Sequence, residues 1–258
     1  MPDVLFETVE RYHEDKSWGK VLDAGTGVSS VKWLMGLDSC TAWTAITADE
    51  QMKANIVAAS GVSLREGKDE LLVGNWMDDE FTATLDKYDT IVADYLIGAV
   101  DGFSPYTQDL IIRRLREHMA PGGRLYIIGM YPIPDHAPGD AEIVTEVRRV
   151  RDACILLAGH RPYREYPSEW VIRHMEKEGL RVFKNKVFTI LHSKESVTRQ
   201  LMVARSKLEL MSQASVRMAM DSYLTDIEER VAEVMSQQSK RTVPLSHDYV
   251  LAAELPLE

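Results

Sequence analysis

The sequence has little cysteine and no recognisable metal-binding pattern. Its 258 residues include only two cysteines, Cys40 and Cys154, which lie far apart and form no CxxC pair. This excludes a small disulfide-stapled scaffold and indicates reduced, incidental thiols. The seven histidines are scattered and show neither HxH nor HExxH spacing, so the sequence predicts no metal centre.

Long apolar runs are also missing. Even the segment 126–130 is only as long as a short buried strand, so we expect no membrane-spanning helix. The first residues, MPDVLFETVERYHEDK, are acidic and lack a hydrophobic core, which predicts neither a secretory signal nor a typical transit peptide. A cytoplasmic protein is the default interpretation, although a processed organellar protein would look the same.

Positive charge is in the minority, with 30 Lys and Arg residues against 40 Asp and Glu residues and a formal net charge of −10. A chain this acidic is repelled by a phosphate backbone unless it carries a basic patch. The densest basic stretches, 113–116 and 148–151, are interleaved with apolar residues at helical spacing, which is typical of solvated helix faces. We therefore expect no nucleic-acid partner.

What the chain does contain is an alternation of short apolar strands and helical segments, in one domain that spans 1–258. Strands are expected at 20–24, 41–47, 70–74, 89–93, 124–130, 181–191 and 248–253. Helices are expected at 4–13, 31–37, 49–59, 104–119, 140–158 and 170–177, with a short helical stretch around 79–85. This pattern predicts an α/β fold with a mostly parallel sheet covered by helices on both faces.

The segment 193–241 has no Pro and no Gly, and we expect two helices inserted there, before the last strand. Its second half carries an apolar stripe at a spacing of three or four residues, formed by Met220, Leu224, Ile227, Val231 and Val234. Such a stripe is typical of a core-facing or dimer-facing helix. The insertion is therefore a candidate lid or homodimerisation element.

The most informative segment is 21–30, VLDAGTGVSS, in which an apolar strand runs into a turn with two glycines. Glycines at a strand-to-helix turn let the backbone approach a bound nucleotide. Asp23, two residues before the first glycine, favours a ligand that carries positive charge and would repel a pyrophosphate. Ser30 stands where a dinucleotide fingerprint has its third glycine, which disfavours a nicotinamide-dependent oxidoreductase.

This segment resembles the first motif of class I S-adenosylmethionine (SAM) dependent methyltransferases, usually an acid-x-Gly-x-Gly turn. DTIVAD at 89–94 is similar to the fourth-strand motif of that family, and APGGRL at 120–125 is similar to the turn before its fifth strand. The final pair of strands looks like its closing hairpin. The resemblance implies a Rossmann-like, doubly wound sheet of seven strands, mostly parallel with an antiparallel last strand. It also implies SAM as the cofactor and S-adenosylhomocysteine as its product.

The resemblance further implies where the cofactor binds. The positions that line its methionine part are matched by Asp23, Gly25, Thr26 and Gly27. At the ribose position the family usually has an acid. This chain has Thr47 there and Asp49 two residues later, and either side chain can bond to a hydroxyl.

After the third strand, Asn75 and Trp76 are expected beside the adenine, although Trp76 fits ordinary packing equally well. Asp94 and Tyr95 close the fourth strand, and the resemblance places both near the transferable methyl group. Methyl transfer from a sulfonium is an in-line displacement, so a base is needed only if the nucleophile holds a proton. Asp94 is the candidate for orienting or deprotonating the acceptor, and a helix cap is its alternative role.

A candidate substrate site is the stiff segment RPYREYP, in which Tyr163, Arg164 and Tyr166 suit an anionic or aromatic compound, with a surface loop as the alternative. The sequence ADYL at 93–96 lacks the Asn/Asp-Pro-Pro-Tyr/Phe signature of base-amino methyltransferases. The predicted acceptor is therefore a small-molecule N, O or S nucleophile. A protein methyltransferase and a catalytically inactive methyltransferase-like binding module are the alternatives.

Overall fold

The computed structural model describes residues 4–236 and 242–257. The chain divides into two compact units. The first contains 1–131, 164–187 and 248–258, and the second contains 132–163 and 188–247. The second unit is thus built from two insertions into the first, one after the fifth strand and one between the last two strands.

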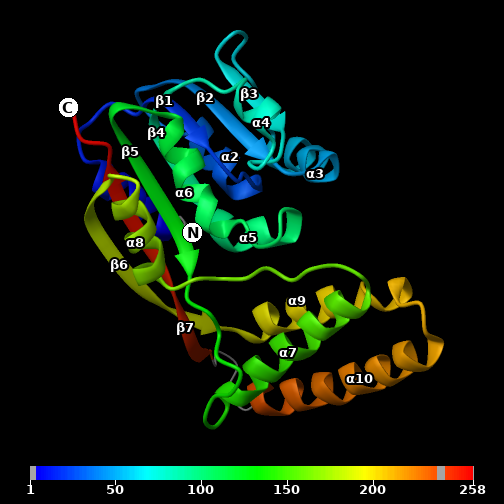
Figure 1. The fold of residues 1–258 in the computed structure, drawn as a ribbon. Coiled ribbons are helices and arrows are strands. Elements are labelled where there is room, and N and C mark those ends of the chain that lie inside the picture. The colour runs from blue at the N-terminus through cyan, green and yellow to red at the C-terminus, as the bar shows by residue number, and fades with distance from the viewer. Residues whose placement is uncertain (1–3, 237–241, 258) are drawn as a thin grey trace. The chain divides into compact units, whose positions relative to one another are not determined.

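A seven-stranded sheet organises the first unit (Figure 1). Its strands lie in the order β3-β2-β1-β4-β5-β7-β6. Their bounds are β1 Gly19–Asp23, β2 Cys40–Thr47, β3 Asp69–Val73, β4 Tyr88–Asp94, β5 Met119–Met130, β6 Arg181–His192 and β7 Val243–Glu254. Strands β1 to β5 pair in parallel, whereas β7 runs antiparallel to β5. The predicted mixed sheet with an antiparallel last strand is confirmed.

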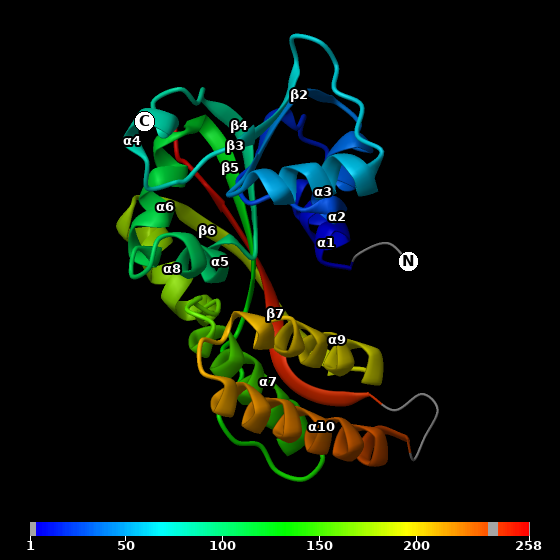
Figure 2. The same cartoon turned by 90° about the vertical axis from the view of Figure 1, so that its right-hand side faces the viewer.

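Helices cover both faces of this sheet (Figure 2). On one face lie α1 (Val4–His13), α2 (Val28–Met35) and α3 (Glu50–Ser60). On the other lie α5 (Leu96–Phe103), α6 (Gln108–Glu117) and α8 (Ser168–Lys177), while the short helix α4 (Asp79–Thr82) follows β3. The central strands are apolar on both sides because each side packs against a helix layer. The carboxyl ends of the parallel strands meet at one edge, where sheets of this kind bind ligands.

The predicted helix 104–119 begins later than expected. In the structure α5 occupies the chain up to Phe103, and α6 does not start until Gln108. The Ser104 hydroxyl bonds to the side chain of Asn75 instead of capping a new helix. Tyr106 then adopts a left-handed φ of 66°, which interrupts helical hydrogen bonding. The sequence analysis also missed α5 itself.

In the second unit, the described residues form a bundle of α7 (Ala141–Leu157), α9 (Lys194–Arg205) and α10 (Ala214–Ser236), with a 3-10 turn at Leu208–Leu210 (Figure 1). The two helices expected in 193–241 are present, and the last residues of that segment, 237–241, lie outside the described residues.

The apolar stripe of α10 faces the core of this bundle. Leu224, Ile227 and Val231 are buried, and they belong to one apolar cluster with Val147 of α7 and Leu201 of α9. The apolar residues spaced three or four apart therefore form the side of α10 that faces the core of the bundle. A role of these helices as a lid or a dimer contact stays a prediction.

Candidate active site

The glycine turn after β1 lies between strands β2 and β4. The Ala24 N–H donates to the Val92 carbonyl at 2.8 Å, and the Thr26 N–H donates to the Ile46 carbonyl at 2.7 Å. Helix α2 starts directly after Gly27. The turn is thus tied to both neighbouring strands at the edge of the sheet where ligands bind.

Asp23 is the last residue of β1, and its side chain is fully buried. Neither carboxylate oxygen has a hydrogen-bond partner of normal geometry among the described residues. Burial raises the pKa of Asp23 to about 6, although the nearby Thr26 and Ser30 hydroxyls and the Gly25 N–H hold it down in part. Because a buried carboxylate without a partner is costly, the arrangement fits a ligand that brings a positive charge to the end of β1.

The two glycines of the turn have different surroundings. A Cβ atom at Gly25 would lie 3.0 Å from the Cδ1 atom of Leu96, which is tighter than ordinary contact. A Cβ atom at Gly27 would meet no described atom within 4 Å, and the backbone there is extended, with φ −134°. Gly25 therefore lets α5 pack against the turn, whereas Gly27 leaves space that a ligand can fill.

The residues expected at the ribose lie at the carboxyl end of β2. Thr47 ends the strand, is buried, and accepts a hydrogen bond at its carbonyl from the Gly74 N–H at 3.0 Å. Asp49 caps α3, because its Oδ1 atom accepts from the Met52 N–H at 2.6 Å. The cap does not use the Oδ2 atom of Asp49.

Asn75 and Trp76 follow β3, and both side chains support the fold. The Nδ2 atom of Asn75 donates to the Ser104 hydroxyl at 2.8 Å, and its Oδ1 atom accepts from the Met77 N–H at 2.9 Å. Trp76 is buried, and its Nε1 atom donates to the Ala24 carbonyl at 2.6 Å. The indole therefore braces the glycine turn, which is a packing role.

Asp94 and Tyr95 stand at the carboxyl end of β4, and both are half-buried. Tyr95 has a left-handed φ of 49° and occupies the position directly before α5, where its side chain makes no capping hydrogen bond. Its N–H donates to the Ile128 carbonyl at 2.9 Å, and its hydroxyl donates to the Oδ1 atom of Asp248 at 2.8 Å. The sequence analysis missed Asp248 because it lies 153 positions from Tyr95 and belongs to no motif.

No protein-family model and no curated protein sequence matches the chain. Solved structures do match it over nearly its whole length. A candidate methyltransferase from Bacillus halodurans is 13% identical with a TM-score of 0.61, and the match covers 98% of this chain and 100% of that one. Mycolic acid cyclopropane synthase CmaA1, complexed with S-adenosylhomocysteine and CTAB, is 12% identical with a TM-score of 0.53, over 97% and 83%. The chain has the class I methyltransferase fold.

The class I methyltransferase fold does not determine the reaction. The [4+2]-cyclase SpnF is 14% identical to this chain with a TM-score of 0.52, and the match covers 99% of this chain and 81% of that one. The function must therefore be argued from the residues at the edge of the sheet.

The expected substrate segment is divided between the two units of this methyltransferase fold. Tyr163 is exposed and belongs to the second unit. Arg164 and Tyr166 belong to the first, where the Arg164 N–H donates to the Gly98 carbonyl at 3.2 Å. Tyr166 stacks on Trp170, with ring centroids 4.2 Å apart.

Other polar residues of the first unit were missed because they come from separate segments. The carboxylate of Glu165 packs against Gly98. A Cβ atom added to Gly98 would lie 2.3 Å from both carboxylate oxygens. The hydroxyl of Tyr131, directly after β5, lies 2.6 Å from the Ser168 hydroxyl and donates to Glu169 at 3.0 Å. Sequence spacing gives no signal for either contact.

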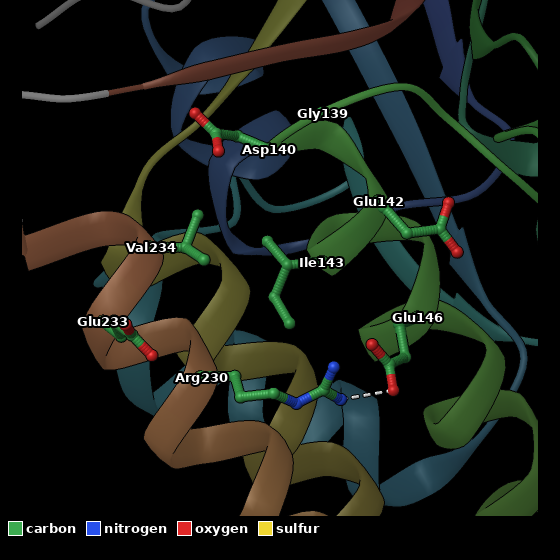
Figure 3. A pocket seen from close by; sticks show the side chains of 8 residues that line it. All are labelled: Gly139, Asp140, Glu142, Ile143, Glu146, Arg230, Glu233 and Val234. Atoms are coloured by element: carbon green, nitrogen blue, oxygen red, sulfur yellow. Dashed lines mark hydrogen bonds and ion pairs between the residues drawn. The ribbon is translucent and has the colours of Figure 1, made fainter.

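A pocket of about 350 Å³ lies in the second unit (Figure 3). Its lining consists of Gly139, Asp140, Glu142, Ile143, Glu146, Arg230, Glu233 and Val234. Burial acts to raise the pKa of Glu146, but hydrogen bonds from Arg230 and Tyr223 outweigh it and hold that pKa below its ordinary value. None of the expected site residues lines this pocket.

Within residues 4–236 and 242–257, no group of three or more His, Cys, Asp or Glu side chains is placed to hold a metal ion. No helix in the same ranges combines the length and the apolar character needed to cross a bilayer.

Proposed function

We propose that the protein is a SAM-dependent methyltransferase that acts on a small-molecule nitrogen, oxygen or sulfur nucleophile. The observation that carries this proposal is the buried Asp23 carboxylate, which has no hydrogen-bond partner among the described residues and stands beside the glycine turn. SAM carries positive charge on its amino group and its sulfur, so it compensates Asp23, whereas a pyrophosphate would be repelled. The S-adenosylhomocysteine complex of CmaA1, which shares the fold, supports the same cofactor.

Five of the expected residues have a defined role in the proposed site. Asp23 binds the amino group of SAM, and the open space at Gly27 admits its methionine part. The Thr47 hydroxyl and the Oδ2 atom of Asp49 bind the ribose hydroxyls. Trp76 acts indirectly, because it holds the glycine turn in place.

When bound, SAM supplies a methyl group activated by the sulfonium. The protein contributes alignment and exclusion of water, because an in-line displacement needs the nucleophile and the methyl carbon at close range. Asp94 and Tyr95 at the end of β4 orient the acceptor, and Asp94 takes up a proton that the acceptor loses.

Thr47 favours a second candidate function, a methyltransferase-like module that binds a partner without catalysis. The acid usual at the ribose position is replaced by a neutral hydroxyl, which removes a charge-assisted hydrogen bond of roughly 1.5–3 kcal/mol. In that case Asp23 would still stand beside the turn, but the affinity for SAM would be low.

Calorimetric titration with SAM, S-adenosylhomocysteine and NADH tests the proposal. We expect micromolar binding of both sulfur ligands, no binding of NADH, and loss of binding in Asp23→Ala but not in the exposed control Asp86→Asn. A screen of amines, hydroxyls, thiols, carboxylates and protein substrates then identifies the acceptor. Absence of binding by both sulfur ligands overturns the proposal in favour of the binding module.

A further inference from the structure

The side chain of Asn75 has most of its hydrogen-bonding groups occupied within the protein. Its Oδ1 atom accepts from the Met77 N–H at 2.9 Å and from the Ser104 hydroxyl at 3.0 Å. Its Nδ2 atom donates to the same hydroxyl at 2.8 Å. Because a backbone N–H must face an oxygen, the Met77 contact fixes which end of the amide is the carbonyl.

One polar group of this amide is left over. The oxygen has two lone pairs, which Met77 and Ser104 both use, whereas the nitrogen has two hydrogens, of which Ser104 receives one. Among the described residues the second hydrogen has no partner, and Asn75 is half-buried. A molecule that contacts this amide therefore meets a donor and no acceptor.

The surrounding backbone holds the amide in place. The Asp78 N–H donates to the Asn75 carbonyl at 3.0 Å, which closes a turn. A Cβ atom at Gly74 would lie 2.2 Å from the Cζ atom of Phe81, so this ring packs directly against the end of β3. Trp76, the next residue, is buried. The direction of the Asn75 donor is therefore set before a ligand binds, which lowers the cost of binding.

Asn75 also stands where the base of the proposed cofactor is expected. Strands β1, β2 and β3 are parallel neighbours, so their carboxyl ends follow one another along the sheet at steps of about 5 Å. In the proposed function Asp23 at the end of β1 binds the amino group of SAM, and Thr47 at the end of β2 binds the ribose. The base is the next group along the molecule, and Asn75 follows the end of the next strand, β3.

The chemistry of adenine then decides the contact. Its ring nitrogens accept hydrogen bonds, whereas its 6-amino group donates them. An amide that can only donate pairs with a ring nitrogen, and it has nothing to offer the amino group.

We propose that Asn75 recognises the purine of the cofactor by donating its second N–H to a ring nitrogen, and that the site does not select the 6-amino group. This inference rests on the proposed function and deepens it. Ser104 is a positioning residue, because its hydroxyl occupies the amide oxygen and leaves only the donor for the ligand. The site should therefore take purine cofactors with or without an amino group at position 6.

Calorimetry on the full chain tests this with analogues of S-adenosylhomocysteine. One analogue carries hydrogen in place of the 6-amino group, and three deaza analogues carry a C–H in place of N1, N3 or N7. We expect the 6-hydrogen analogue to bind within threefold of S-adenosylhomocysteine, and at least one deaza analogue to bind at least tenfold more weakly. A loss of more than threefold with the 6-hydrogen analogue overturns the inference. So does binding of all three deaza analogues within tenfold.

Asn75→Asp should reverse the pattern. The carboxylate still accepts from the Met77 N–H, but it offers an acceptor in place of the donor. S-adenosylhomocysteine should then bind at least tenfold more tightly than the 6-hydrogen analogue, and the loss with the deaza analogue should disappear. Asn185→Asp is the matched control, because it adds the same charge at an exposed position of β6, the opposite edge strand of the sheet, and should leave both ratios unchanged. Ratios in Asn75→Asp equal to those of the original chain overturn the role of Asn75.

Ser104→Ala tests the positioning role. Without the hydroxyl, the Asn75 oxygen regains a lone pair that can accept from the 6-amino group, so S-adenosylhomocysteine should gain at least threefold over the 6-hydrogen analogue. A merely structural role would weaken both ligands equally. That result, in a variant that thermal unfolding shows to be folded, overturns the role of Ser104.

Heteronuclear NMR of the side-chain amides reports on Asn75 directly, its two hydrogens being assigned by their loss in Asn75→Asp. Binding of the 6-hydrogen analogue should move the signal of the second hydrogen downfield, and an unchanged signal in the complex overturns the inference. If S-adenosylhomocysteine binds and the affinity ratios are wrong, the inference alone fails. If neither S-adenosylhomocysteine nor SAM binds the original chain, the proposed function fails and the inference fails with it.

Discussion

The indole of Trp76 donates a hydrogen bond of 2.6 Å to the carbonyl oxygen of Ala24, which ties the loop after β3 to the glycine turn after β1. Both residues are buried. In Trp76→Phe the carbonyl loses its partner and the smaller ring leaves a void, so we expect the free energy of unfolding to fall by about 2–4 kcal/mol in urea denaturation. Affinity for S-adenosylhomocysteine should also fall several-fold. The control is Trp170→Phe, at a partly buried indole stacked on Tyr166, where only the loss of stability is expected.

Gly27→Ala should weaken ligand binding without weakening the fold. The added Cβ meets no described atom within 4 Å, and the backbone angle suits alanine, so we expect the free energy of unfolding to stay within about 1 kcal/mol. The methyl group occupies space assigned to the cofactor, so affinity for S-adenosylhomocysteine should fall at least tenfold in calorimetry. Gly36→Ala, whose Cβ would make only ordinary contacts, is the matched control. Unchanged affinity in Gly27→Ala would place the cofactor elsewhere.

The affinity for SAM should depend on pH through Asp23. Its pKa is about 6 in the ligand-free protein because of burial, and a bound cation lowers that pKa. Below pH 6 Asp23 must lose a proton before it can bind the cation, so the affinity should fall by up to tenfold for each unit that the pH decreases. Above pH 6 the affinity should not depend on pH. Calorimetry of S-adenosylhomocysteine between pH 5 and pH 8 measures this, as its amino group stays protonated.

Asp23→Asn provides the control for that titration. The variant should bind weakly with no pH dependence across this range. Because the raised pKa of Asp23 destabilises the folded state as pH rises from 3.8 to about 6, the variant should be at least as stable as the original chain at pH 7. A variant that keeps the same pH profile would show that another group titrates.

His13 should make the protein less stable in acid. Its ring bonds to the Tyr126 hydroxyl at 3.0 Å and stacks on Trp18 with centroids 3.7 Å apart. Burial lowers the pKa of His13 from 6.5 to about 4, with a smaller contribution from the charge of Arg124. As pH falls below 6.5, His13 becomes protonated in the unfolded chain, whereas in the folded chain it stays neutral until about pH 4. The free energy of unfolding therefore decreases between pH 6.5 and about pH 4. The loss is at most about 3 kcal/mol.

Urea denaturation between pH 4 and pH 7.5 measures this loss. His13→Gln should flatten the pH dependence, whereas the exposed control His136→Gln should leave it unchanged. Equal slopes in His13→Gln and the original chain would assign the acid sensitivity to other groups.

Much of the fold was predictable because its signals are local. Apolar runs of strand length, turn glycines and helical spacing each act within a few residues, and they located the strands and the core face of α10 correctly. The same local reasoning placed a helix start at Ser104, and it was wrong because the Ser104 hydroxyl bonds to Asn75, which lies far away in the sequence. A capping signal predicts a helix only if the hydroxyl has no better partner.

The sequence by itself determined the order of the strands and of most helices along the chain, and the position of Asp23 before the glycine turn, since these depend on neighbouring residues. Only the tertiary structure decided that Asp23 has no hydrogen-bond partner among the described residues, that Trp76 braces the turn, and that the Tyr95 hydroxyl donates a hydrogen bond to Asp248. The last contact joins residues 153 positions apart. It exists because β7 pairs antiparallel with β5, which brings Asp248 to the carboxyl end of the parallel strands. No local sequence pattern predicts that pairing.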